Sequence, residues 1–183
     1  MSALSLFTLK PNVTRQDALH TFSMGPSARY WRMRSGPLQR IAEAYVPYLG
    51  YRVRYDMAGA PQQRFFALDA VIGSLDLFEF PRLPCGDELI AVETRNHLPL
   101  SLSPERAEEQ LREKALRVIF LQGFFKLRGD RIQVTREAAE FYVPYWLAFH
   151  GDAKAVRCRV LNAVRRRIEG AKASAFFEQW LAA

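Results

Sequence analysis

The chain carries one short phrase twice: AEAYVPY at residues 42–48 and AEFYVPY at residues 139–145. Six of the seven positions are identical, and the two phrases lie 97 residues apart. Self-similarity that extends beyond a single phrase is the mark of a duplicated architecture. We therefore interpret the chain as two copies of one unit, and we test this by aligning the sequence outward from the phrase.

The flanking segments align in the same order on both sides of the phrase. Downstream, LDAVIGSLD aligns with LNAVRRRIE, and upstream WRMRSGPLQ aligns with FKLRGDRIQ. The aligned pairs are 68–76 with 161–169, 31–39 with 125–133, and 8–19 with 102–111. Four blocks in one order predict that each copy repeats the same sequence of helices and strands.

Two leading helices are predicted from their start signals. Thr14 with Asp17 opens the first, and Ser103 followed by Pro104 opens the second. The second helix is amphipathic, because its apolar residues recur on one face at helical spacing. That face should pack on a sheet; its residues are Ala107, Leu111, Ala115, Val118 and Ile119.

Antiparallel strands are predicted after each helix. RYWRMRS and FFKLRG alternate basic and apolar residues, as a strand with one wet face does. Each YVPY phrase then opens a hairpin, and the strand of the second phrase is expected to lie in the interior of the sheet or to be covered on both faces. Residues 89–94 form a short strand in the connector, and GAKASAFFEQWL forms a terminal helix that covers the sheet or docks a partner.

The repeated phrase itself predicts a backbone irregularity flanked by tyrosines. Proline cannot donate to a strand ladder, so Pro47 and Pro144 indicate a strand start, a bulge or an edge. The aromatic residues of the phrase either pack around that irregularity or bind a ligand, and packing is the favoured interpretation. These residues are Tyr45, Tyr48, Tyr142 and Tyr145.

The predicted fold class is α+β, with two tandem copies of a helix followed by antiparallel strands. The copies pack with pseudo-twofold symmetry, and a C-terminal helix completes the fold. The first repeat spans residues 1–80, the connector residues 81–101, and the second repeat with its terminal helix residues 102–183.

The segment LDAVIGSLD, with Asp69, Ala70 and Gly73, resembles PepSY-type modules and, more loosely, cystatin-like folds. The second copy has Asn162, Ala163 and Arg166 at these positions, which predicts that the glycine turn is lost there. The resemblance implies a noncatalytic α+β module.

Composition narrows the classes of protein. The 183 residues carry a net charge of +7, and only Cys85 and Cys158 are present, without the spacing of a disulfide framework or a zinc site. The longest apolar run, residues 141–149, is far shorter than the roughly 20 residues of a membrane span. The N-terminal sequence has no signal-peptide pattern. We expect a cytoplasmic protein with no membrane contact, no metal and no cofactor.

Basic residues two positions apart are the candidate anion-binding sites. If they share one sheet face with the interleaved aromatic residues, they form a surface for nucleic acid or another anionic ligand. The alternative is an ordinary solvated face covered by arginine side chains. The candidates are Arg32, Arg34, Arg52, Arg54, Lys126, Arg128, Arg157 and Arg159.

No sequence motif for catalysis is present. A Cys85–His97 nucleophile pair is one interpretation of PCGDE, and a turn built on proline and glycine is the favoured one. We predict a noncatalytic binding or scaffold protein whose unknown protein or small-molecule ligand binds at the junction of the repeats. Nucleic-acid or anionic-ligand binding through basic strand faces is the alternative.

Overall fold

The computed structural model describes residues 4–24, 26–57, 59–121, 132–151 and 156–182. The fold is mixed α+β, and most of its strand pairs are antiparallel. The described elements are β1 Leu4–Leu9, α1 Arg15–Met24, α2 Pro26–Ser35, β2 Leu38–Met57, β3 Ala60–Asp69, β4 Leu77–Phe80, the 3-10 turn η1 Gly86–Glu88, β5 Leu89–Thr94, α3 Pro104–Leu121, β6 Gln133–His150, β7 Arg157–Asn162, β8 Arg167–Ile168 and α4 Ala171–Ala182.

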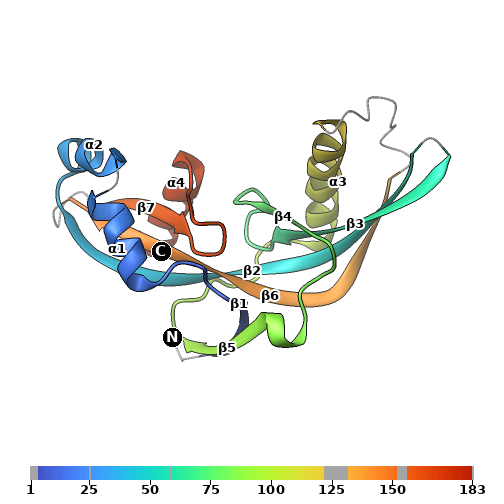
Figure 1. Ribbon diagram of the computed structural model, residues 1–183, viewed down its shortest axis with the longest axis horizontal. Helices are drawn as coiled ribbons and strands as arrows, with labels where there is room; N and C mark the ends of the chain where they lie inside the picture. The colour runs from blue at the N-terminus through green and yellow to red at the C-terminus, as the bar shows by residue number, and fades with distance from the viewer. Residues whose placement is uncertain (1–3, 25, 58, 122–131, 152–155, 183) are drawn as a thin grey trace.

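Two long strands, β2 and β6, run the length of the molecule side by side and antiparallel (Figure 1). The sheet has the order β4-β3-β2-β6-β1-β5, and β7 extends β6 on its other flank before β8. The predicted hairpins are confirmed as β2–β3 and β6–β7. The predicted connector strand is confirmed as β5. The interior placement of β6 is also confirmed, because it pairs with β1, β2 and β7.

Both leading helices start where their caps predict. The Thr14 hydroxyl and backbone N–H both donate to the Asp17 carboxylate, at 2.6 and 3.0 Å, and Asp17 N donates back to the hydroxyl at 3.2 Å. These hydrogen bonds lower the Asp17 pKa. In α3, Arg106 N donates to Ser103 Oγ at 3.4 Å. Capping satisfies backbone donors that the first turn leaves free.

Each leading helix packs on the hairpin of the other half. Helix α1 of the first half packs against β6 and β7 around Trp146, while α3 of the second half packs against β2 and β3 around Phe66. The predicted apolar face of α3 is confirmed, since Ala107, Leu111, Ala115 and Ile119 are buried and Val118 is half-buried.

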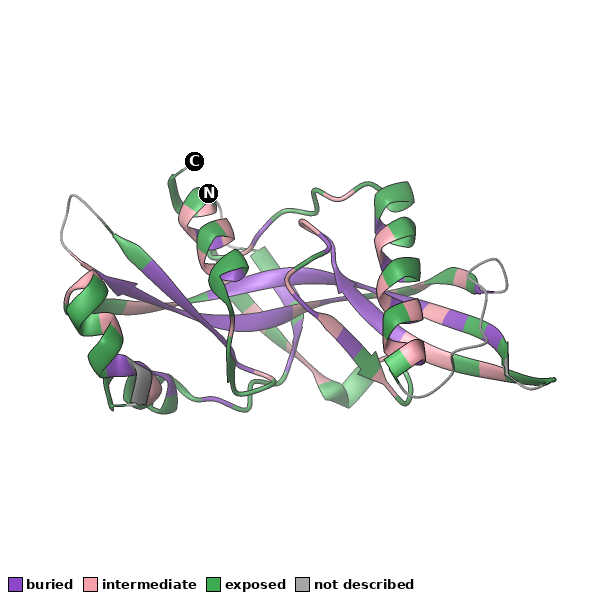
Figure 2. Ribbon diagram, turned by 90° about the horizontal axis from the view of Figure 1, so that it is seen from above, coloured by how far each residue is buried: buried purple, intermediate pink, exposed green. Residues whose placement is uncertain are grey.

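Three buried clusters line the central strands, parts of which are purple in Figure 2. One cluster lies under α1 and one under α3. The third lies on the opposite face of the sheet, where Phe177 of α4 packs against Tyr145 with ring centroids 5.9 Å apart. The predicted covering role of the terminal helix is therefore confirmed.

The prediction of a strand at RYWRMRS is wrong. These residues belong to α2, with Ala28 buried and Trp31 half-buried, three residues apart on the inner side of a helix. The alternation of basic and apolar residues fits period two, but the inward residues follow helical spacing. Gly36 ends the helix with a φ of +83°, and its N–H donates to Arg32 O at 3.1 Å, as a C-terminal glycine cap does.

Of the three places predicted for the prolines, the structure shows a local sheet edge, because β3 and β7 pair only with the residues that follow each proline. Pro47 and Pro144 lie inside β2 and β6, opposite Tyr142 and Tyr45, and the nearest register shift falls at Leu49/Tyr51. Prolines fit inside these strands because the neighbouring strands, β3 beside β2 and β7 beside β6, no longer pair at the proline positions. The proline carbonyls instead accept N–H groups from the turns that follow β3 and β7. These bonds are Ala70 N to Pro47 O at 2.8 Å and Ala163 N to Pro144 O at 3.0 Å.

Candidate functional site

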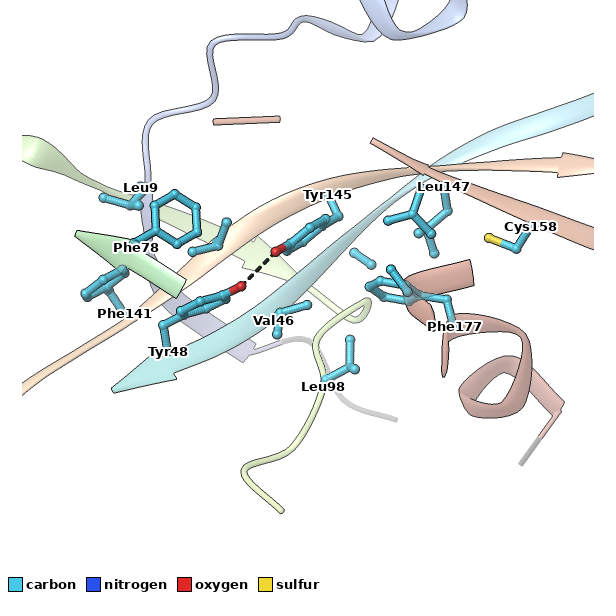
Figure 3. Close-up of a cluster of buried hydrophobic side chains, with 14 of the residues drawn as sticks. Leu9, Val46, Tyr48, Phe78, Leu98, Phe141, Tyr145, Leu147, Cys158 and Phe177 are labelled. Atoms are coloured by element: carbon cyan, nitrogen blue, oxygen red, sulfur yellow. Dashed lines mark hydrogen bonds between the residues drawn. The ribbon is translucent and has the colours of Figure 1, made fainter. Parts of the chain in front are cut away.

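The repeated phrases meet at the centre of the sheet. Val46 lies directly opposite Val143, which holds the same position in the other phrase. The side chains of Tyr48 and Tyr145 point toward one another, and their hydroxyl oxygens lie 2.8 Å apart (Figure 3). Both rings are buried, and burial raises the pKa of each well above its ordinary value. The two phenols therefore stay neutral, one donating to the other.

Tyr45 and Tyr142 face the other side of the sheet. The Tyr45 hydroxyl donates to the Glu43 carboxylate at 3.1 Å, and burial, with the charge of Glu43, raises the Tyr45 pKa. The backbone of Tyr45 exchanges hydrogen bonds with Asn96 O and Leu98 N. Tyr142 is half-buried, and its carbonyl accepts the Thr8 hydroxyl at 2.9 Å. These two tyrosines thus anchor the segments that lead into α3 and α1.

Two turns of the same design flank the paired tyrosines. After β3, Asp69 Oδ1 accepts the backbone N–H groups of Ile72 and Gly73 at 2.9 and 2.8 Å. After β7, Asn162 Oδ1 accepts those of Val164 and Arg165 at 3.1 and 3.0 Å. A short side chain that bonds backbone groups ahead of it is a standard turn device.

The prediction that the glycine turn is lost in the second half is wrong. Gly73 has a φ of +67°, and Arg166, at the aligned position, has a φ of +55°. Arg166 is the only described non-glycine residue with a positive φ. The turn at Asn162 therefore has the same left-handed backbone conformation as the turn at Asp69, although it lacks the glycine that adopts this conformation most easily.

The turns carry an ionic group that we call the junction network: Asp76, Asn162, Arg165, Arg167 and Glu169. Arg165 Nη1 donates to Asp76 Oδ1 at 2.9 Å, and Arg167 lies 3.5 Å from Asp76 and 3.3 Å from Glu169. Asn162 Nδ2 lies 3.4 Å from both Asp76 and the Tyr145 hydroxyl. Two carboxylates and two guanidinium groups are thereby joined to the tyrosine pair.

Burial dominates the electrostatics of the junction network. The two carboxylate side chains are only 8% and 7% exposed, and burial raises the pKa of both Asp76 and Glu169 despite the arginines beside them. The charges of Asp76 and Glu169 also raise the pKa of Tyr145, and the charge of Asp76 raises the pKa of Glu169. Lys114 of α3 lies near Asp69 and Asp76, and burial lowers its pKa. Within the junction network, the charges of the two carboxylates are thus balanced by those of Arg165 and Arg167.

A cavity of about 360 Å³ lies on the face of the sheet that carries α1, and residues of both halves line it. Trp146 forms one wall, and its indole N–H donates to Val13 O at 3.0 Å. Charged and polar groups come from Arg15, Glu43 and Asn96. The other lining residues are Pro11, Val13, Thr14, Ile41 and Ala42. The volume falls in the range of small-molecule sites.

The basic candidates do not gather on one strand face. Arg32 and Arg34 lie on α2, while Lys126 and Arg128 lie outside the described residues. In β2, Arg52 pairs with Glu137 at 2.6 Å and Arg54 donates to Gln63 at 3.1 Å, on the face away from α3.

The β7 candidates lie on the opposite face of the sheet from Arg52 and Arg54. Arg157 pairs with Glu178 at 3.6 Å, and Arg159 is buried beneath α1 and α2. Its guanidinium lies 5.3 Å from the Phe22 ring and 5.4 Å from the Trp31 ring, and it donates to Phe22 O at 3.3 Å. A buried arginine packed between aromatic rings serves the core.

Cys85 and the histidines occupy separate places. Cys85 is exposed at the start of η1, where Arg82 Nη1 approaches its sulfur at 3.2 Å, whereas Cys158 is buried, which raises the pKa of its thiol to about 12. His97 pairs with the backbone of Tyr45, and His150 is buried against Gly36 O and Trp31. Within the described ranges, no cluster of three acidic, histidine or cysteine side chains is placed to hold a metal.

Sequence reasoning missed the junction network and the cavity. The alignment of LDAVIGSLD with LNAVRRRIE pairs Asp76 with Glu169, and that shared acid was the available signal. Nothing in the sequence placed Asn96 beside Trp146, because their proximity depends on how the strands are ordered.

Comparison of the chain with protein-family models, curated proteins and solved structures gave no match. The likeness to PepSY-type and cystatin-like modules therefore stays a prediction. None of the described helices has the length and apolar character needed to cross a bilayer.

Proposed function

We propose that this chain is a noncatalytic binding protein built from two copies of one module, with its ligand site where the two copies meet. The carrying observation is the solvent-open cavity of about 360 Å³ that the β1–α1 segment, β2 and Asn96 line together with Trp146 of β6. A site of this kind exists only when both halves are present.

The duplication is supported by which residues face each other. Residues at aligned positions pair directly: Val46 with Val143 across the sheet, and Tyr48 with Tyr145 through their hydroxyls. Contacts also recur in matched form. Asn12 N donates to Ala163 O at 2.8 Å, and Ser101 N donates to Ala70 O at 2.9 Å, before α1 and α3 respectively. A twofold relation between copies makes each contact occur twice.

The binding role is supported by the character of the cavity wall. An indole ring and aliphatic side chains supply apolar surface, and one cation, one carboxylate and one amide supply directional contacts. Sites for small molecules combine apolar surface with a few polar groups that fix the orientation of the ligand. The paired tyrosines support a noncatalytic role for the junction, because their raised pKa values make them poor proton acceptors at neutral pH.

The test uses the fluorescence of Trp146 as a reporter. In a Trp31→Phe/Trp180→Phe variant, Trp146 is the remaining tryptophan. A library of small polar metabolites is titrated against this variant, and binding shifts the emission of the indole. Asn96→Phe places a ring at the cavity mouth and should weaken that binding by roughly tenfold or more, since a filled pocket leaves no room for the ligand.

Gln179→Phe, on the exposed side of α4, is the matched control. A bound metabolite should be recovered unchanged after incubation. Binding that Asn96→Phe leaves intact, or conversion of the ligand to a product, would overturn the proposal.

A further inference from the structure

Helix α2 presents its charged and aromatic residues to solvent. Tyr30 and Met33 are 56% and 81% exposed and lie three residues apart on the outer side of the helix. Arg29, Arg32 and Arg34 are exposed around them. Arg34 Nη1 donates to the Tyr30 hydroxyl at 2.8 Å, which holds the phenol ring along the helix surface. We call these five residues the α2 surface.

The segment that carries α2 has charges of one sign. Between Asp17 and Glu43 the sequence contains four arginines and no acidic residue. Asp17 is engaged in capping α1. Elsewhere acids stand beside bases: Arg52 has Glu137, Arg64 has Glu79, and Arg165 has Asp76. The described part of the chain therefore exposes a concentrated positive surface at α2.

We propose that the α2 surface binds single-stranded nucleic acid. Three guanidinium groups offer contacts to successive phosphates, and the exposed face of the Tyr30 ring offers a platform on which a base stacks. This pairing of a basic surface with an accessible aromatic ring is how sequence-tolerant single-strand binding works. No residue of the α2 surface lines the cavity beside Trp146, so the two proposals stand independently.

An anionic bilayer fits the α2 surface less well. Interfacial helices bury a broad apolar face, and their binding strength scales with the apolar area that enters the lipid. On the exposed side of α2, only Tyr30 and Met33 offer such area, and three arginines surround them. Stacking and phosphate contacts use four of the five residues, the three arginines and Tyr30, whereas lipid insertion uses two.

The test is a fluorescence anisotropy titration of the whole protein with a labelled oligonucleotide of about 20 thymidines. Affinity should fall about 20-fold between about 50 and about 200 mM salt if three phosphates are contacted. Arg29→Gln/Arg32→Gln/Arg34→Gln should weaken binding roughly tenfold or more at the lower salt. Tyr30→Ala should weaken it roughly five- to tenfold through loss of stacking.

The matched control is Arg95→Gln/Arg106→Gln/Arg112→Gln, which removes the same charge from exposed positions outside α2. This control should retain most of the affinity, and its circular dichroism and that of the α2 variants should match the wild type. Equal loss in both triple variants, or no binding at the lower salt, would overturn the proposal. So would binding to vesicles containing phosphatidylserine but not to the oligonucleotide.

Discussion

The pair formed by Tyr48 and Tyr145 is the smallest unit that joins the two halves. Each hydroxyl is buried, and each has the other as a partner at 2.8 Å. Tyr48→Phe leaves the Tyr145 hydroxyl with only Asn162 near it, so we expect a loss of about 1–3 kcal/mol in the free energy of unfolding. Removing both hydroxyls should cost less than the sum of the single changes. Urea denaturation of the two single variants and the double variant measures this coupling. Strict additivity would show that the hydroxyls act separately.

Gly73 and Arg166 give a second test at single residues. Both have a positive φ, but a β-carbon at Gly73 would collide with the Gln110 side chain of α3. Gly73→Ala should therefore lower the free energy of unfolding by at least the roughly 1–2 kcal/mol of left-handed strain, because the end of the Gln110 side chain can turn aside from the new methyl group. Arg166→Gly should change it by less than about 1 kcal/mol, because relief of strain and added chain entropy oppose each other. Thermal unfolding of both variants decides the comparison; a Gly73→Ala protein as stable as the wild type would contradict it.

Trp146 shows which side-chain roles were predictable. Its burial follows from the apolar run in the sequence, and Trp146→Ala should cost roughly 3–5 kcal/mol of stability through lost packing against α1. Trp146→Phe keeps most of the packing but loses the donor to Val13 O, so its cost should be clearly smaller. Tyr142→Ala should cost the least of the three variants, because the Tyr142 ring is only half-buried. Denaturant midpoints of the three variants should rank them in this order, and a Trp146→Ala midpoint like the wild type would refute it.

Among the structural elements, the turns after β3 and β7 matter most for the pH dependence of stability, because they carry the junction network. The pKa values of Asp76 and Glu169 are higher in the folded chain than their ordinary values of 3.8 and 4.5. The folded state therefore holds protons that the unfolded state releases, so the stability from protonation is complete below the ordinary values and is lost as pH rises through the folded ones.

This sign predicts a pH dependence. As pH falls from about 7 to about 4, the melting temperature of the wild type should rise relative to that of Asp76→Asn/Glu169→Gln. Differential scanning fluorimetry of both proteins across that range measures the difference. A difference that shrinks on acidification would mean that the ion pairs with Arg165 and Arg167 outweigh burial.

Elements with a local signal were predicted well from the sequence. The caps at Thr14 and Ser103, the stripe on α3, both hairpins, β5 and α4 each depend on residues within one segment. Helix α2 was mistaken for a strand because arginines fill its exposed positions and erase the usual helical stripe. Strand β1 was not predicted: it is held by pairing with β5 and with Tyr142, far along the chain.

The whole molecule is one continuous sheet rather than two separate ones. Strands β2 and β6 come from different halves, yet they pair over most of their length. We therefore expect a single cooperative unfolding transition, with tryptophan fluorescence and far-ultraviolet circular dichroism coincident across a urea gradient. Two resolved transitions would show that the halves fold as independent domains.

The candidate sites were less predictable than the fold class because they are assembled over long distances. The cavity needs Asn96 and Trp146 to line the same pocket, and the basic residues separate onto a helix and two sheet faces. Alternation along a strand predicts which residues share a side, but it does not predict which strands become neighbours. That information lies in the register of β2 with β6.

The crossed packing of the leading helices has a consequence for the covalent chain. Helix α1 packs on the hairpin of the later half, and α3 packs on the hairpin of the earlier half. The segment between β4 and β5 therefore connects two parts of the chain that already hold each other by noncovalent contacts. A protease that nicks this segment should yield two fragments that migrate together under native conditions and part only in denaturant. The backbone can thus be opened at that point without dismantling the architecture.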